Sequence, residues 1–194
     1  MLTHHHADHA DIAQYRARFD VPVVAHPRAA AQLDGVVDET VEDGGTIEAG
    51  ALRLRAILTE GHAAGHLALL AGEGGDCLTG DVLFAGTVGG TRAPGATGYA
   101  DLRASVMDRL CTLPPETRLH PGHTQPTTVA AEWKGNPFVR IWRGLDPEAA
   151  EPCTVQGQPA TLVLWAPDYD GTNKAWVRFP GGQDAIVGGS QVKR

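Results

Sequence analysis

Apolar residues in the first 35 positions follow a helical spacing, then a continuous run, then a helical spacing again. The spacing between positions 10 and 19 predicts a short helix that ends near Asp20. The run VPVVAH at 21–26 predicts a buried strand, and RAAAQLDG at 28–35 predicts a second short helix closed by Gly35. This alternation of helix and strand is α/β behaviour.

From Val37 the pattern changes to that of paired strands. TIEAGALRLRAILTEG at 46–61 alternates apolar and polar residues on either side of an Ala-Gly turn, which predicts two strands. HLALLAGEGGDCLTGDVLF at 66–84 holds two apolar runs around the glycine-rich GEGG, a hairpin signal. The stretch 86–98 is rich in Gly, Thr, Ala and Pro and predicts a loop.

The next segments predict two helical stretches and one more strand. Asp101 is expected to cap a helix over 101–113. The apolar residues that share one face of this helix are Leu102, Val106, Leu110 and Leu113. TRLHPGH at 117–123 predicts a short strand that runs into a loop, and TVAAEWKGNPFVRIWRG predicts a helix up to the break at Asn136-Pro137.

A segment rich in Pro and Glu, LDPEAAEPCT, follows Gly144 and predicts a linker. We therefore expect a main domain over 1–146 and a small β-rich C-terminal unit over 151–194. The unit holds three β-like runs separated by DYDG and PGG turns, and it forms either an appendage or strands that complete the main fold. Its aromatic residues are expected to form the core of this unit, namely Trp165, Tyr169, Trp176 and Phe179.

Composition excludes several classes of protein. The chain has 194 residues, of which 42% are hydrophobic and 20% charged, as in a soluble globular protein. The net charge of −7 and the lack of a basic stripe argue against nucleic-acid binding, and no apolar run approaches a membrane span. Three scattered cysteines without a C-x-x-C pair predict free thiols in a reducing compartment, so we expect a cytoplasmic protein.

Four of the nine histidines lie within the stretch THHHADH near the start of the chain. Alternate residues point to the same side of an extended backbone, so His4 and His6 present two imidazoles together. Asp8 and His9 add a carboxylate and a third imidazole. Such ligands suit zinc, iron or manganese, whereas the remnant of an expression tag would usually be a longer run of histidines.

Three later motifs also place polar residues where predicted strands end. These are GHAAGH at 61–66, Gly80-Asp81, and PGH at 121–123. Glycine or proline flanks each motif and lets the backbone pack closely around a site. One such histidine would be structural, but several of them together with H-x-H-x-D-H indicate a metal site.

With these motifs the chain resembles the metallo-β-lactamase-fold hydrolases, especially their glyoxalase II-like branch, over about residues 2–143. The resemblance implies an αββα sandwich of the α+β or α/β class. It also implies that His4, His6 and His62 hold one metal ion, that Asp8, His9 and His123 hold a second, and that Asp81 bridges the two. His66 is implied to be a neighbour of the site rather than a ligand. His5 is expected to be a spacer, and His26 and His120 to lie outside the site.

The implied activity is hydrolysis of a thioester or small acyl ester that depends on two divalent metal ions. Zinc is favoured, with iron and manganese as alternatives. Two cations that share a water lower its pKa from 15.7 to about 7, which supplies hydroxide to attack the carbonyl. Asp81 and Asp8 are the expected catalytic residues, because Asp81 bridges the metals and Asp8 can protonate the leaving group. No G-x-S-x-G motif offers another nucleophile.

Three positions depart from the family pattern. Only Met1 and Leu2 precede Thr3, where family members have opening strands, so we expect an N-terminally incomplete sandwich with an unpaired strand edge. No tyrosine follows His123, which puts a glutathione thioester in doubt, and Ala63-Ala64 replaces the usual Thr-Pro. The alternatives are a phosphodiesterase or nuclease of the same fold, and a non-catalytic remnant that acts as a binding protein. The expected partner is a small acyl substrate, and the sequence leaves the oligomeric state open.

Overall fold

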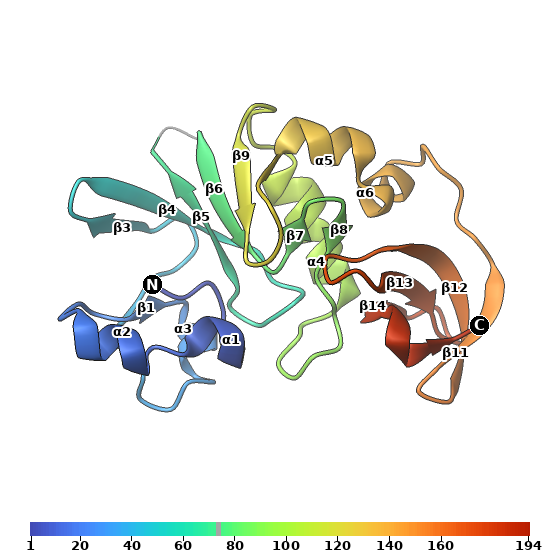
Figure 1. The fold of residues 1–194 in the computed structure, drawn as a ribbon, viewed down its shortest axis with the longest axis horizontal. Coiled ribbons are helices and arrows are strands. Elements are labelled where there is room, and N and C mark those ends of the chain that lie inside the picture. Colours follow the sequence, from blue (N-terminus) through green and yellow to red (C-terminus); the bar gives the residue numbers. More distant parts are fainter. Residues whose placement is uncertain (73–74) are drawn as a thin grey trace.

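The largest sheet lies in the middle of the chain, in a computed structural model that describes residues 1–72 and 75–194 (Figure 1). Its strand order is β10-β9-β6-β5-β4-β3, in which β6 and β9 run parallel and the other neighbours antiparallel. The strands are β3 (Thr46–Ala49), β4 (Leu52–Leu58), β5 (Leu67–Ala71), β6 (Asp76–Gly80), β9 (Arg118–Pro121) and β10 (Thr127–Thr128). The predicted strands are confirmed, but the hairpin turn at Glu73–Gly74 lies outside the described residues.

The alternation in β4 and β5 gives this sheet two apolar faces. Leu54 and Ala56 point to one face, where they pack against Leu67 and Leu69. Ile57 points to the other face and joins the largest hydrophobic cluster of the molecule. Successive side chains of a strand alternate between faces, so strands with apolar residues at both parities can be covered on both sides.

Helices from the second half of the chain cover one face of the sheet (Figure 1). They are α4 (Tyr99–Ala104), which continues as a π-helical segment (Ser105–Leu110), α5 (Val129–Gly135) and α6 (Pro137–Trp142). Leu102, Val106 and Leu110 share the buried face, as their spacing predicts. No helix in the described part of the chain is long and apolar enough to cross a membrane.

Two local predictions in this region are wrong. The expected cap Asp101 lies inside the first turn of α4, and the helix begins after Gly98, whose φ of +116° is a conformation that glycine adopts without strain. An aspartate in the first turn still interacts favourably with the helix dipole. The expected loop 86–98 contains a short strand, β8 (Thr87–Val88), because its backbone pairs with β7 (Leu83–Phe84).

The N-terminal segment packs as a small unit beside the sheet (Figure 1). It contains α1 (Ala7–Ala10), α2 (Ala13–Arg18), β1 (Val24–Ala25), α3 (Pro27–Ala30) and β2 (Glu39–Thr40). Leu2, Val23, Ala25 and Ala29 form its core. Leu2 donates a backbone hydrogen bond to Val24, so the histidine motif starts from a fixed backbone.

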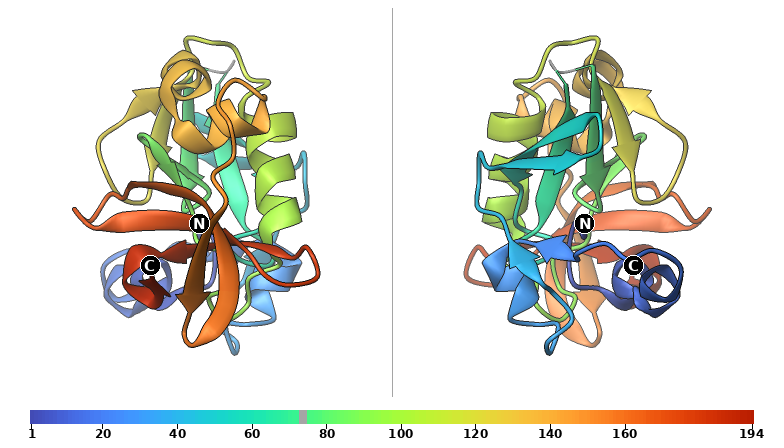
Figure 2. Two further views of the ribbon diagram at one scale, coloured as in Figure 1. Left: turned by 90° about the vertical axis from the view of Figure 1, so that its right-hand side faces the viewer. Right: turned by 90° about the vertical axis from the view of Figure 1, so that its left-hand side faces the viewer.

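The C-terminal residues form a second sheet at the opposite end of the molecule from the N-terminal segment (Figure 1), and Figure 2 shows each of these ends facing the viewer. Its order is β14-β13-β12-β11-β15. The elements are β11 (Glu151–Val155), β12 (Gln158–Pro167), β13 (Asn173–Arg178), β14 (Asp184–Gly188), a 3₁₀ turn (Gly189–Gln191) and β15 (Val192–Lys193). Trp176 and Ile186 point into the main hydrophobic cluster, whereas Ala175 and Val177 pack on the other face.

The four aromatic residues of this unit do not share one core, contrary to the sequence prediction. Trp165 and Phe179 pack against the unit's own cluster, but Trp176 is 3% exposed inside the main cluster. Tyr169 is 42% exposed at the turn between β12 and β13. All three cysteines are free, as predicted.

Candidate metal centre

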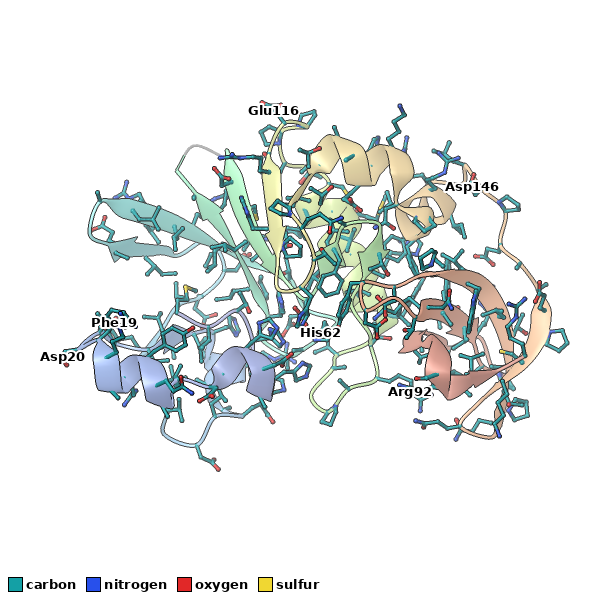
Figure 3. All side chains as sticks on the ribbon, viewed as in Figure 1. Phe19, Asp20, His62, Arg92, Glu116 and Asp146 are labelled. Atoms are coloured by element: carbon teal, nitrogen blue, oxygen red, sulfur yellow. The ribbon has the colours of Figure 1, made fainter. Side chains whose placement is uncertain are left out.

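The predicted ligands come together because three strand ends meet at one edge of the six-stranded sheet. β4, β6 and β9 run in the same direction, and their carboxyl ends lead into His62, Asp81 and His123 respectively. The histidine motif approaches from the N-terminal segment, where Asp8 and His9 belong to α1. His62 lies near the middle of the molecule, between the N-terminal helices and the C-terminal sheet (Figure 3).

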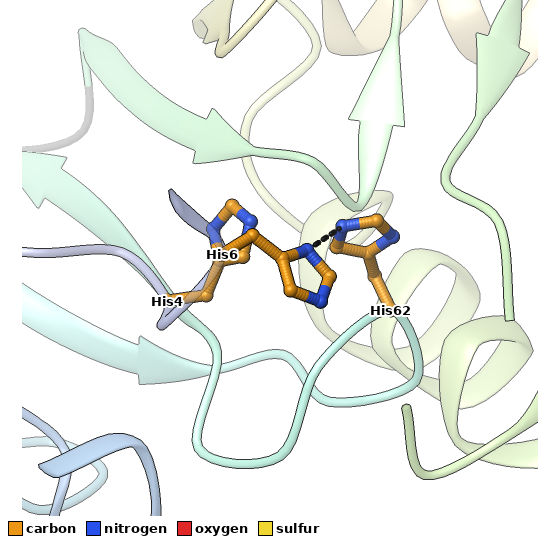
Figure 4. A group of neighbouring side chains, drawn as sticks. All are labelled: His4, His6 and His62. Atoms are coloured by element: carbon orange, nitrogen blue, oxygen red, sulfur yellow. Dashed lines mark hydrogen bonds between the residues drawn. The ribbon is translucent and has the colours of Figure 1, made fainter. Parts of the chain in front are cut away.

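His4, His6 and His62 form the first ligand group, with candidate ligand atoms all within 4.8 Å of one another. His6 Nδ1 lies 2.9 Å from His62 Nε2 (Figure 4). The outer nitrogens of these two rings face backbone carbonyls, since His6 Nε2 is 3.2 Å from Pro94 O and His62 Nδ1 is 2.9 Å from Gly90 O. His4 Nδ1 is 3.1 Å from Thr3 Oγ1. Each ring is thus oriented from its far side, as in protein metal sites.

Asp8, His9, Asp81 and His123 form the second group, again within 4.8 Å. His9 Nε2 lies 3.2 Å from Asp81 Oδ1, and His123 Nε2 lies 3.4 Å from both Asp81 Oδ2 and Asp8 Oδ2. Asp81 also faces the first group, because its Oδ2 is 3.8 Å from His62 Nε2. The structure therefore brings together every residue that the resemblance implied as a ligand.

Several buried atoms of both groups have no hydrogen-bond partner among the described residues, 1–72 and 75–194. They are His4 Nε2, His9 Nε2 and Asp81 Oδ1. A buried polar atom without a partner costs about 1–3 kcal/mol, so these atoms indicate that something else binds there. Imidazole nitrogens and carboxylate oxygens are ligands for divalent zinc, iron and manganese, and the residues present fit such ions.

Burial keeps the imidazoles of His4 and His62 neutral. Burial lowers the pKa of His62 to about 4, and it also lowers the pKa of His4, with neighbouring imidazoles adding to the effect. A neutral imidazole has the free electron pair that a metal ion needs. These two imidazoles can therefore bind a cation without first losing a proton.

Opposite effects operate around Asp81. Burial acts to raise its pKa, but the imidazoles of His9, His62 and His123 outweigh burial and hold the pKa below its usual value. The Asp81 carboxylate in turn raises the pKa of His9. The carboxylate thus stays ionised at the point where the two groups meet.

His66 belongs to neither group but fixes the backbone of Asp81. The Asp81 backbone N–H donates to His66 Nε2 at 3.1 Å, and His66 Nδ1 lies 2.9 Å from Thr59 Oγ1. Burial lowers the pKa of His66 to about 3, so its ring remains a neutral acceptor. This location agrees with its predicted role as a neighbour of the site.

The other histidines also lie outside both groups. His5 faces Pro94 O at 3.4 Å and lines the cleft in front of the centre. His26 caps α3, where it accepts a hydrogen bond from the Arg28 N–H. His120 pairs with Asp76 at 2.7 Å.

A cleft of about 450 Å³ opens onto both groups. The residues that line it are His5, His6, Ala7, Asp8, Gln32, His62, Asp81, Ala93, Pro94, Gly95, His123 and Tyr169. No lysine or arginine is among these lining residues of the described chain. A larger cleft of about 980 Å³ lies between the loop before α4 and the C-terminal sheet, and it contains none of the ligand residues.

Sequence reasoning missed one residue of this centre. The ring of Tyr169 lies parallel to that of His123, at an interplanar angle of 6° and a centroid distance of 4.8 Å. Tyr169 stands in the DYDG turn, and the sequence predicts it only as part of the core of the C-terminal unit. No spacing rule connects it to His123, because the contact depends on how the C-terminal sheet packs.

Comparisons with known proteins agree with this geometry. The family profile described as "Metallo-beta-lactamase superfamily" matches residues 1–123. A probable metallo-hydrolase of Bacillus subtilis, YqgX, is 31% identical over 157 residues, which cover 72% of this chain and 74% of that protein. A hydroxyacylglutathione hydrolase of Chelativorans is 32% identical over 63% of this chain, but the match spans only 47% of that protein.

The fold also matches solved structures. TTHA1623, crystallised in a di-iron-bound form, is 34% identical with a TM-score of 0.61, and the match covers 70% of this chain and 74% of that one. The predicted α+β metallo-β-lactamase fold is therefore confirmed. Because the family profile covers more than half of the chain, this protein belongs to the metallo-β-lactamase superfamily.

Proposed function

We propose that this protein is a dinuclear-metal hydrolase that cleaves a thioester or small acyl ester. The observation that carries the proposal is the pair of ligand groups with Asp81 between them, in which three buried ligand atoms have no hydrogen-bond partner in the described part of the chain. A single structural metal ion would need only one such group. The relative named as a hydroxyacylglutathione hydrolase supports thioester chemistry.

Each ligand residue has a proposed role. His4, His6 and His62 would hold one cation, Asp8, His9 and His123 would hold the other, and the carboxylate of Asp81, which faces both groups, would serve both. Zinc is the favoured ion, while the di-iron form of TTHA1623 keeps iron as a strong alternative. When bound, the two cations supply hydroxide from water near neutral pH and polarise the substrate carbonyl.

The protein's own groups then bind the substrate and handle its proton. The Asp8 side chain is 60% exposed and borders the cleft, so its carboxylate could accept the proton that the attacking water loses and pass it on to the leaving thiol or alcohol. Ala93, Pro94 and Gly95 form a small, uncharged wall of the cleft onto which both ligand groups open. A substrate that carries carboxylates, such as a glutathione thioester, would meet no cationic side chain among the described lining residues. We therefore propose a substrate with a small, uncharged acyl group, and we do not assign its thiol or alcohol part.

The direct test is metal content and hydrolysis measured on the same preparations. We expect about two metal ions per chain and turnover of a model thioester by the wild type. His6→Ala and Asp81→Ala should each lose at least one metal ion and abolish hydrolysis. His120→Ala is the matched control, because His120 lies near His123 in sequence but outside both groups, and it should change neither readout.

The same preparations separate the alternatives. Turnover of bis(p-nitrophenyl) phosphate without thioester hydrolysis would identify a phosphodiesterase instead. A wild-type protein that binds two metal ions but hydrolyses neither substrate would favour a binding protein.

A further inference from the structure

His123 differs from the histidines of the first group in how its ring is held. The rings of His6 and His62 donate hydrogen bonds to the backbone carbonyls of Pro94 and Gly90, and the ring of His4 is hydrogen-bonded to the hydroxyl of Thr3. For His123, no hydrogen bond to its outer nitrogen is found in the described part of the chain. Its side chain is also 31% exposed, so neighbours enclose it less than they enclose His62.

The ring of His123 is held by stacking against the ring of Tyr169, which lies at the turn between β12 and β13 of the C-terminal sheet. Tyr169 covers one face of the imidazole with nearly parallel planes, and Phe84 contacts both rings, at centroid distances of 5.1 Å from Tyr169 and 6.1 Å from His123. Such pairs contribute about 0.5–1.5 kcal/mol beyond the area they bury. A stack restricts rotation of the imidazole and leaves both of its nitrogens free.

The turn that presents Tyr169 is itself fixed. The carboxylate of Asp168 forms an ion pair with Lys174 Nζ at 2.8 Å, and both side chains are at most 9% exposed. The Tyr169 N–H donates to Asp168 Oδ1, and Asp170 closes the turn with Thr172. A tip anchored in this way can position another ring, whereas a mobile turn could not.

We propose that Tyr169 is a positioning residue of the metal centre, through which the C-terminal sheet orients His123 toward the second ligand group. The proposal rests on the proposed function, since it concerns the same centre. It gives the C-terminal unit a role in metal binding. The phenolic hydroxyl is not needed for this role, because the contact uses the face of the ring.

The decisive experiment is a zinc titration of the metal-free full-length protein against a chromophoric chelator, which resolves two stepwise affinities. Removal of a residue that orients a metal ligand usually weakens affinity by about 10–100-fold. We expect Tyr169→Ala to weaken one zinc site by about tenfold or more and to leave the other unchanged. Tyr169→Phe should restore wild-type affinity at both sites.

Two controls separate positioning from folding. Tyr15→Ala removes another exposed tyrosine, on α2, and should leave both affinities unchanged. In the metal-free protein, the NMR signals of the His123 ring should show a ring-current shift in the wild type and in Tyr169→Phe. Tyr169→Ala should lose that shift while its far-ultraviolet circular dichroism stays native.

The outcomes distinguish this proposal from the function on which it rests. Unchanged zinc affinities in Tyr169→Ala, or equal weakening at both sites, would overturn the positioning role even if the wild type binds two ions and hydrolyses thioesters. If the wild type binds fewer than two ions, the proposed function fails. In that case the His123 signals still show whether Tyr169 holds the ring.

Discussion

Gly122 shows how closely the backbone approaches the second ligand group. A Cβ atom at this position would collide with Asp81 Oδ1 and with the ring of His9. Its N–H also donates to Gly80 O at 2.8 Å, which fixes the strand end before His123. Any side chain at 122 must therefore displace a metal ligand or the strand end.

We expect Gly122→Ala to lose most hydrolytic activity and at least one metal ion, while the chain remains folded. Elemental analysis together with circular dichroism checks this result. Gly135→Ala is the matched control, because its Cβ would meet nothing within 4 Å at the end of α5. Full metal content in Gly122→Ala would contradict the crowding seen here.

The sequence predicts which residues gather as candidate ligands, but it does not predict the groups that orient them. H-x-H-x-D-H, His62, Asp81 and His123 carry their chemistry in their side chains and their order along the chain. The carbonyls of Gly90 and Pro94 belong to residues whose side chains give no sign of a role. Tyr169 does have a distinctive side chain, but its contact depends on tertiary packing.

Asn136 joins α5 to α6 and to the strand β8. Its Oδ1 accepts hydrogen bonds from the N–H groups of Phe138 and Val139, while its Nδ2 donates to Thr87 O and to Glu132 Oε2. The side chain is 1% exposed. One residue thus caps a helix and satisfies two buried acceptors.

Asn136→Ala should lower the free energy of unfolding by about 1–3 kcal/mol, because it removes the cap and leaves buried groups unpaired. Urea unfolding followed by circular dichroism measures the change. Asn136→Asp keeps the cap acceptor but brings a second carboxylate to Glu132, so it should destabilise as well. A stable Asn136→Asp variant would indicate that the contact to Glu132 contributes little.

Helices and strands were predicted correctly where the apolar residues are periodic. The predictions failed where one backbone turn determines where an element begins or whether a strand forms. The alternation in β4, and the apolar face of α4 and the π-helical segment that follows it, extend over enough residues to be recognised in the sequence. The start of α4 depends on the positive φ of Gly98, and β8 depends on its partner β7. Neither can be recognised from local composition.

The C-terminal sheet is tied to the rest of the chain by burial on one face and by the fixed turn at 168–172. Lys174 is 7% exposed and its charge is compensated by Asp168. Lys174→Met would leave a buried carboxylate without its partner. We expect this change to cost about 3–5 kcal/mol of stability, whereas the double variant Asp168→Leu/Lys174→Met should recover most of it.

Thermal and urea unfolding of the single and double variants provide the measurement. An equal loss of stability in the single and the double variant would mean that packing at this position, rather than the ion pair of Asp168 and Lys174, contributes the stability.

Acid should destabilise the metal-free protein through its buried histidines. The pKa of His66 falls from 6.5 in the unfolded chain to about 3 in the folded one, so the unfolded state binds its proton first as the pH drops. The stability that a neutral His66 contributes is complete above about pH 6.5 and is lost as the pH falls toward about 3. Each such group adds a slope of up to about 1.4 kcal/mol per pH unit in this window.

Urea midpoints in the presence of a chelator, measured between pH 7 and pH 4.5, test this dependence. His66→Gln should show a shallower decline than the wild type. Parallel declines would show that other groups control acid unfolding.

The hydrophobic cluster shared by the helices and the C-terminal sheet has a consequence for the exposed segment at 145–150 that joins them. A protease can reach this segment, yet a single cut there does not remove the apolar contacts of Trp176 and Ile186. The two fragments should remain a noncovalent complex that elutes as one species and melts in one cooperative transition. We therefore expect that the folded state does not need the peptide bond at this point, because the shared hydrophobic cluster holds the two parts together.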